Sequence, residues 1–60
     1  MTSTEALVSI TQTVLRQRIA PEQTSRVDIC NALQSVWLLL PDDANMNVAF
    51  HELCRRYGTH

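Results

Sequence analysis

The side chains that could bind a metal ion or attack a substrate are two cysteines and two histidines, Cys30, Cys54, His51 and His60. His51 and Cys54 are three residues apart, so they would share one face of a helix. A structural zinc site needs four ligands and commonly contains a close cysteine pair, which this sequence lacks. The cysteines lie at or beside apolar positions, where a free thiol behaves as a small hydrophobe. We therefore expect no metal ion and no cofactor.

The same residue types could supply catalytic groups, with a Cys–His pair as the nucleophile and Glu52 as a general base. Such groups also need a shaped pocket. The sequence contains one glycine, so it has no glycine-rich loop, and a chain of 60 residues leaves little room for a ligand cavity of useful size. We predict that the protein is not an enzyme and that it has no catalytic residues.

The charged residues are few and nearly balanced, with a formal net charge of −1 and no lysine. Proteins that bind nucleic acid usually carry a basic face, so this composition disfavours nucleic acid. Arg16 and Arg18 do not share a helix face, and the adjacent Arg55 and Arg56 are expected to diverge. We interpret the arginines as a solvated surface. The functional alternative is an anchor for an acidic partner, because the planar guanidinium suits carboxylates.

Three segments position these side chains, and each repeats apolar residues at helical spacing. No segment alternates with the period of a strand. Helices are expected at about residues 4–19, 22–39 and 44–57, separated by two prolines. The fold class is therefore all-α, a small three-helix bundle in a single domain over residues 1–60. So small a core gains from a partner chain, and homo-oligomerisation could complete it.

Capping signals mark the ends of the expected helices. Thr2 and Glu5 have the spacing of a capping box. Asp42 or Asp43 could cap the third helix. Gly58 suits the left-handed position after it.

Each expected helix has an apolar stripe that would face the core. The stripe residues are Leu7, Ile10 and Val14, flanked by Val8, Leu15 and Ile19, in the first helix; Ile29, Leu33, Val36 and Leu40, widened by Cys30 and Trp37, in the second; and Met46, Ala49, Phe50, Leu53 and Tyr57 in the third. Thr11 counts as a polar position of the first helix. The pattern predicts that the three helices share one core.

The second helix ends in four consecutive apolar residues, 37–40, which is more than one stripe can bury. At 100° per residue, Leu38 and Leu39 lie roughly 120–140° from Leu33, on either side of it. Either the second helix is the central element, contacted by both other helices, or a second chain covers its end. The two arrangements are compatible, and the sequence leaves both open.

These features favour a small non-enzymatic protein-interaction module, a regulatory, inhibitor or adaptor factor that binds another protein through an apolar patch. Tryptophan is enriched at binding hot spots. The expected contact residues are Trp37, Leu38 and Leu39 at the centre of the patch and, in a second region, Arg55, Arg56 and Tyr57. The expected partner is another protein, a second copy in a homodimer, or both. If the patch joins two copies, the end of the first helix that carries Arg16 and Arg18 is left for the external partner.

The alternative is a helix-turn-helix-like regulator that binds nucleic acid through the third helix, because asparagine and arginine can hydrogen-bond base edges. The side chains available for this are Asn45, Asn47, His51, Arg55 and Arg56. Asp42, Asp43 and Glu52 would repel phosphates, and the turn lacks the glycine often found there.

The N-terminal segment has no basic region and no apolar core, so a secretory signal is not expected. No apolar run reaches the roughly 18 residues that a membrane span needs. We expect a cytoplasmic protein with reduced thiols, and its small size and opening methionine suit a bacterial or phage accessory protein.

Overall fold

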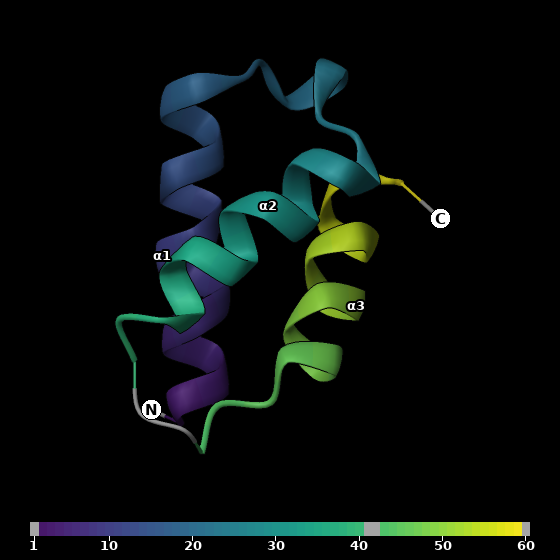
Figure 1. Ribbon diagram of the computed structural model, residues 1–60. Coiled ribbons are helices and arrows are strands. Elements are labelled where there is room, and N and C mark those ends of the chain that lie inside the picture. The colour runs from purple at the N-terminus through teal and green to yellow at the C-terminus, as the bar shows by residue number, and fades with distance from the viewer. Residues whose placement is uncertain (1, 41–42, 60) are drawn as a thin grey trace.

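A computed structural model describes residues 2–40 and 43–59 and shows an all-α three-helix bundle (Figure 1). The elements in chain order are α1 (Ser3–Arg18), a short 3-10 helix η1 (Pro21–Gln23), α2 (Arg26–Trp37) and α3 (Met46–Tyr57). In Figure 1, α1 and α3 run in the same direction, while α2 returns between them and crosses α1 near its own C-terminal end. Each helix packs against the other two, so the predicted fold class is confirmed.

The N-terminus of α1 is capped as the sequence predicts. The Thr2 hydroxyl oxygen accepts a hydrogen bond from the Glu5 backbone N–H at 3.1 Å, which satisfies one of the donors that a helix start leaves unpaired. The helix ends at Arg18, and Ile19 adopts an extended conformation. This agrees with the expected end at residue 19, given that helix boundaries vary by a residue or two.

The start of α2 differs from the prediction. Residues Pro21–Gln23 form η1, and α2 begins only at Arg26. The reason is a capping box at Ser25: its hydroxyl accepts from the Asp28 N–H at 3.3 Å, while the Asp28 carboxylate accepts from the Ser25 N–H at 3.0 Å. The hydrogen bond that the Ser25 hydroxyl donates to the Asp28 carboxylate at 2.8 Å and, next, the bond from the Ser25 N–H lower the pKa of Asp28 below its ordinary value. The expected start at residue 22 was therefore wrong.

The start of α3 is also set by a residue other than the expected one. The Asn45 side-chain oxygen accepts from the Val48 N–H at 3.1 Å and caps the helix. Asp43 is exposed and is not the cap, and Asp42 lies outside the described residues. The Asn45 N–H also donates to the Thr4 hydroxyl at 3.0 Å, so this cap ties the start of α3 to α1.

The end of α3 follows the prediction. Gly58 has a φ of 70°, the left-handed conformation that glycine adopts without a steric penalty. Its N–H bonds the Arg55 carbonyl at 3.3 Å, and the next N–H, of Thr59, bonds the Cys54 carbonyl at 2.9 Å. The last turn of α3 is therefore closed by backbone hydrogen bonds.

One hydrophobic core lies where the three helices meet. Its buried residues are Leu7, Val8 and Leu15 of α1, Ile29, Ala32, Leu33 and Val36 of α2, Ala44 before α3, and Ala49, Leu53 and Cys54 of α3. The core-facing apolar residues expected in the second helix are confirmed as buried at Ile29, Leu33 and Val36, while Leu40 packs partly buried at their edge. α2 contacts both neighbours, as α1 and α3 also do, so the core is shared by all three helices.

The buried face of α1 is rotated relative to the prediction. Ile10 is 44% exposed, whereas Thr11 is fully buried. Since α1 packs against both α2 and α3, its contact arc is centred between them and includes this threonine. Among the described residues, the Thr11 hydroxyl finds no hydrogen-bond partner. Such a group retains a desolvation cost.

Among the described residues, no helix has the length and apolar character needed to cross a bilayer.

Candidate functional site

Trp37, Leu38 and Leu39 end α2 and are named here the apolar end. Leu38 and Leu39 are 77% and 85% exposed, so the three-helix core does not cover them. Trp37 is half-buried, and its indole N–H donates to the Ala44 carbonyl at 3.2 Å, which fixes the connection to α3 against α2. The apolar end therefore joins an anchored aromatic ring to two leucines in solvent.

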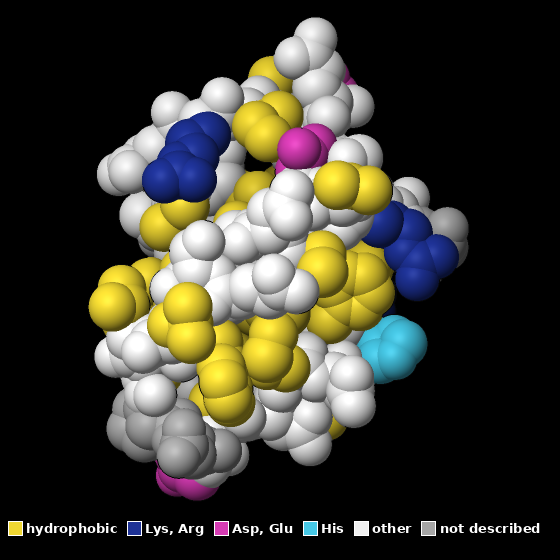
Figure 2. Space-filling model, viewed as in Figure 1, with side chains coloured by type: hydrophobic (Ala, Val, Ile, Leu, Met, Phe, Trp, Pro, Cys, Tyr) yellow, Lys and Arg dark blue, Asp and Glu magenta, His cyan; other side chains and the backbone are white. Residues whose placement is uncertain are grey.

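Only one of the two exposed leucines lies beside a recess. α2 ends at Trp37 and both leucines follow it, and of the two only Leu38 lines the shallow recess beside α2. This recess has a volume of about 300 Å³ and is walled by Gln34, Trp37, Leu38 and Met46. In the view of Figure 2, hydrophobic side chains gather in several groups, with white surface of other side chains and backbone between them. Of the three residues that the sequence predicts as one patch, Trp37 and Leu38 line this recess and Leu39 does not.

An outward stripe on α2, which we call the α2 stripe, was missed by sequence reasoning. It consists of Val27, Cys30, Gln34 and Leu38, at positions i, i+3, i+7 and i+11, the spacing of one helix face. Val27 is 68% exposed, Cys30 is partly exposed, and Gln34 is exposed. The helical spacing of these four residues is present in the sequence, but the core-facing stripe of the same helix is the more prominent pattern.

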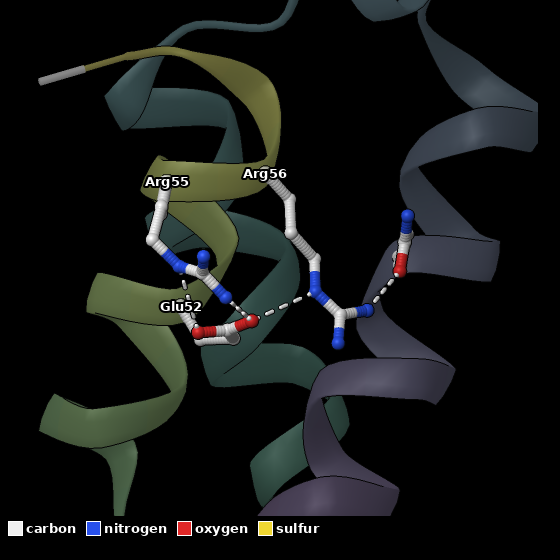
Figure 3. A network of polar contacts seen from close by, with 4 residues as sticks. Glu52, Arg55 and Arg56 are labelled. Atoms are coloured by element: carbon white, nitrogen blue, oxygen red, sulfur yellow. Dashed lines mark hydrogen bonds and ion pairs between the residues drawn. The ribbon is translucent and has the colours of Figure 1, made fainter.

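Arg55 and Arg56 converge instead of diverging, as Figure 3 shows. Arg55 donates two hydrogen bonds to Glu52, from Nη2 to Oε1 at 2.6 Å and from Nε to Oε2 at 3.2 Å. Arg56 Nε donates to the same Oε1 at 3.1 Å, and its Nη1 donates to Gln12 Oε1 at 2.7 Å. The expectation of divergence was wrong, because long guanidinium side chains reach back three and four residues to one carboxylate.

We call Gln12, Glu52, Arg55 and Arg56 the arginine cluster, and it braces α3 against α1. The hydrogen bonds from Arg55 and then Arg56 lower the pKa of Glu52, and the bond to Glu52 raises the pKa of Arg55. Tyr57, partly buried beside the cluster, donates from its hydroxyl to the Gln12 carbonyl at 3.5 Å. The arginine side chains remain 71% and 44% exposed. The two arginine side chains therefore make contacts within the chain and also remain accessible to solvent.

A groove between α1 and α3 runs beside the arginine cluster. Its volume is about 420 Å³, and its walls are Thr4, Glu5, Val8, Ser9, Val48, Glu52 and Arg56. The lining mixes both charges, and the Glu52–Arg56 pair occupies part of it. The groove is therefore part of the helix seam, in which Glu52 and Arg56 pair with each other, whereas Glu5 has no ion-pair partner among the described residues.

The residues with metal or nucleophile chemistry are dispersed. Cys54 is buried and Cys30 is partly exposed, and both thiols are free. The ring of exposed His51 meets Phe50 edge-on at 6.1 Å. Within residues 2–40 and 43–59, no group of three or more His, Cys, Asp or Glu side chains could hold a metal ion. His60 lies outside the described residues.

The connection between α2 and α3 bears on the nucleic-acid alternative. It spans residues 38–45, eight positions, whereas a helix-turn-helix has a turn of about three or four. Asn47, His51 and Arg55 are exposed on α3, but the Arg55 guanidinium is paired with Glu52. An arginine that is already paired with a carboxylate offers less positive charge to a phosphate, and the eight-residue connection is longer than the turn of a helix-turn-helix.

Comparisons with models of known protein families, with curated proteins and with solved structures find no match to this chain. A function must therefore be inferred from the geometry of its own surfaces.

Proposed function

We propose that this protein is a small non-enzymatic interaction module, a regulatory, inhibitor or adaptor factor, that binds another protein through the exposed apolar surface of α2. One observation carries the proposal. Leu38 and Leu39 expose 77% and 85% of their surface in a chain whose other leucines are buried or partly buried.

The physical basis of the proposal is the free energy gained when a partner covers the exposed leucine side chains. Fully burying a leucine side chain is worth about 1.5–3 kcal/mol relative to leaving it in water. The chain does not recover this by folding, because the helix ends with both side chains in solvent. The anchored ring of Trp37 lines the same recess as Leu38, and tryptophan is enriched at binding hot spots.

The arginine cluster and Tyr57 supply a second, polar contact region in this proposal. Arg55 already makes a bidentate contact with Glu52. A carboxylate of the partner would therefore share the guanidinium with Glu52. Exposed ion pairs of this kind contribute little affinity. They influence association rate and orientation. The apolar surface of α2 therefore supplies most of the binding free energy.

We place this function in the cytoplasm, with no cofactor and no metal ion. Cys30 and Cys54 are free thiols, and free thiols suit a reducing compartment. The partner is a protein or a second copy of the chain.

The test uses the tagged chain as bait in extract from its source cells, with the variant Leu39→Asp. Leu39 is 85% exposed, so the charge should leave the fold intact. Gln17→Asp is the matched control, because it adds the same charge at an exposed position on α1. We expect wild type and control to retain a partner that Leu39→Asp loses, with equal helical circular dichroism. Retention of the same partner by Leu39→Asp would contradict the proposal.

A further inference from the structure

We propose that the groove between α1 and α3 binds a helix of a partner protein, and that this helix carries a basic and an acidic side chain two turns apart. The basic side chain meets Glu5 at one end of the groove, and the acidic side chain meets Arg56 at the other. This inference goes beyond the proposed function, which uses the surface of α2, because α1 and α3 alone line the groove.

Glu5 brings an unmatched negative charge to the groove. Its backbone N–H donates to the Thr2 hydroxyl, but its carboxylate does not complete a capping box. At the start of α2, by contrast, the carboxylate of Asp28 turns back and accepts from the Ser25 N–H at 3.0 Å. The Glu5 carboxylate makes no ion pair among the described residues and lines the groove instead. It is therefore available to a cation from outside the chain.

Arg56 gives the other end of the groove the opposite charge. Its Nε donates to Glu52 at 3.1 Å and its Nη1 to Gln12 at 2.7 Å, as Figure 3 shows. Its side chain is still 44% exposed. Glu52 also pairs with Arg55, so two guanidinium groups share one carboxylate and leave a net charge of +1. This end of the groove therefore matches an acidic side chain.

The spacing of the two charges matches one face of a helix. The Arg56 guanidinium lies at the level of Gln12, to which it bonds, and Gln12 follows Glu5 by seven residues. Seven residues of an α-helix span about 10.5 Å, nearly two turns, so a helix alongside α1 offers positions i and i+7 on one face. An extended strand offers side chains on one face about 6.6 or 13 Å apart. A helix is therefore the better match.

The middle of the groove has room for an apolar side chain between the two charges. Its volume is about 420 Å³, within the usual range for binding pockets. Val8 is almost fully buried there, while Val48 remains 54% exposed. Because α1 and α3 run in the same direction (Figure 1), a third helix can lie along both of them. An apolar residue at i+3 or i+4 of the partner helix covers Val48, as in other helix-in-groove contacts.

The experiment uses a synthetic peptide of about 18 residues, long enough to form a helix in isolation. It is alanine-based, with Lys at i, Leu at i+3 and i+4, and Glu at i+7, and fluorescence anisotropy measures its binding. We expect saturable binding to the full chain and binding about fivefold weaker to Glu5→Lys, the effect of an exposed ion pair. Glu22→Lys, the same change at an exposed position on η1, should bind like wild type.

A second peptide, with Glu in place of the Lys at i, separates charge matching from a change in fold. It should bind Glu5→Lys more tightly than wild type, the reverse of the first peptide. Circular dichroism checks that the variants have equal helicity. Leu39 lies outside the groove, so Leu39→Asp should bind the first peptide like wild type even where it loses the captured partner.

Two outcomes overturn the inference. One is no saturable binding of the first peptide to wild type up to about 1 mM. The other is equal affinity of that peptide for wild type and Glu5→Lys. Either result leaves the proposed function to the capture experiment with Leu39→Asp, which does not depend on the groove.

Discussion

The seam between α1 and α3 and the outer face of α2 differ in where their contacts are completed. In the seam, Arg56 meets Gln12 at 2.7 Å and Asn45 meets Thr4 at 3.0 Å, so polar groups from distant parts of the chain satisfy one another. On the outer face of α2, Val27 and Leu38 remain 68% and 77% exposed. The polar groups of the seam are satisfied within the chain, whereas the outer face of α2 leaves apolar side chains in solvent.

The same helix therefore serves two purposes through two of its faces. Ile29, Leu33 and Val36 face inward and are at most 4% exposed. The α2 stripe faces outward from the same backbone. A helix wide enough to touch two neighbours still has an arc that neither covers. The apolar residues on that arc lie outside the buried core, and in the proposed function they contact a partner.

The largest expected effect comes from truncating a leucine on each face of α2. Leu33→Ala should lower the free energy of unfolding by about 2–5 kcal/mol, because it leaves a cavity in the core. Leu38→Ala should change that free energy by less than about 0.5 kcal/mol in the monomer, because its side chain contacts mainly water. Urea unfolding at low protein concentration measures both. Equal losses would remove the distinction between the two faces.

A smaller effect is expected from the polar defect in the core. Thr11 is fully buried and its hydroxyl is unpaired among the described residues, so Thr11→Val should raise the free energy of unfolding by about 1 kcal/mol. Thr13→Val is the control, because the Thr13 hydroxyl already bonds the Ser9 carbonyl at 3.0 Å and is exposed. A destabilised Thr11→Val variant would show that this hydroxyl is satisfied in solution.

The smallest effect concerns the pH dependence of the seam. The arginine partners hold the pKa of Glu52 below its ordinary 4.5. The ionised carboxylate therefore stabilises the fold above pH 4.5, and this contribution is lost as pH falls through the lowered pKa. Glu52→Gln should lower the thermal midpoint slightly at pH 7, with a difference from wild type that shrinks below pH 4.5.

Glu22→Gln is the matched control for that measurement, because it removes an exposed carboxylate on η1, outside the arginine cluster. It should leave the thermal midpoint of wild type unchanged at both pH values. If Glu52→Gln also behaves like wild type, the arginine cluster does not brace the seam in solution.

The existence of the helices could be predicted because apolar periodicity reports burial directly. The first residue of each helix was harder to predict, because several neighbouring residues could each serve as its cap. Pro21 drew the expected start of α2 toward residue 22, although Ser25 and Asp28 had capping-box spacing. Asn45 likewise replaced the neighbouring aspartates as the cap of α3. Cap choice depends on the path of the connecting chain, and sequence spacing does not contain that path.

The candidate site could be predicted only in part. The four apolar residues at the end of the expected second helix exceed what one stripe can bury, which left open whether Leu38 and Leu39 join the core or an interface, and the structure places both in solvent. The α2 stripe required knowing which arc of α2 the neighbours leave open. The convergence of Arg55 and Arg56 on Glu52 depends on side-chain reach, which backbone angles alone do not give.

The most direct test of the claim that the outer face of α2 binds a partner is the size of the chain in extract from its source cells, measured by size-exclusion chromatography. Wild type and Leu38→Asp would be compared at the same concentration. Wild type should elute well above the 6.8 kDa of one chain, in a complex with another protein or with a second copy, while Leu38→Asp should lose that complex. A wild type that elutes as a single chain, or an undiminished complex in Leu38→Asp, would contradict it.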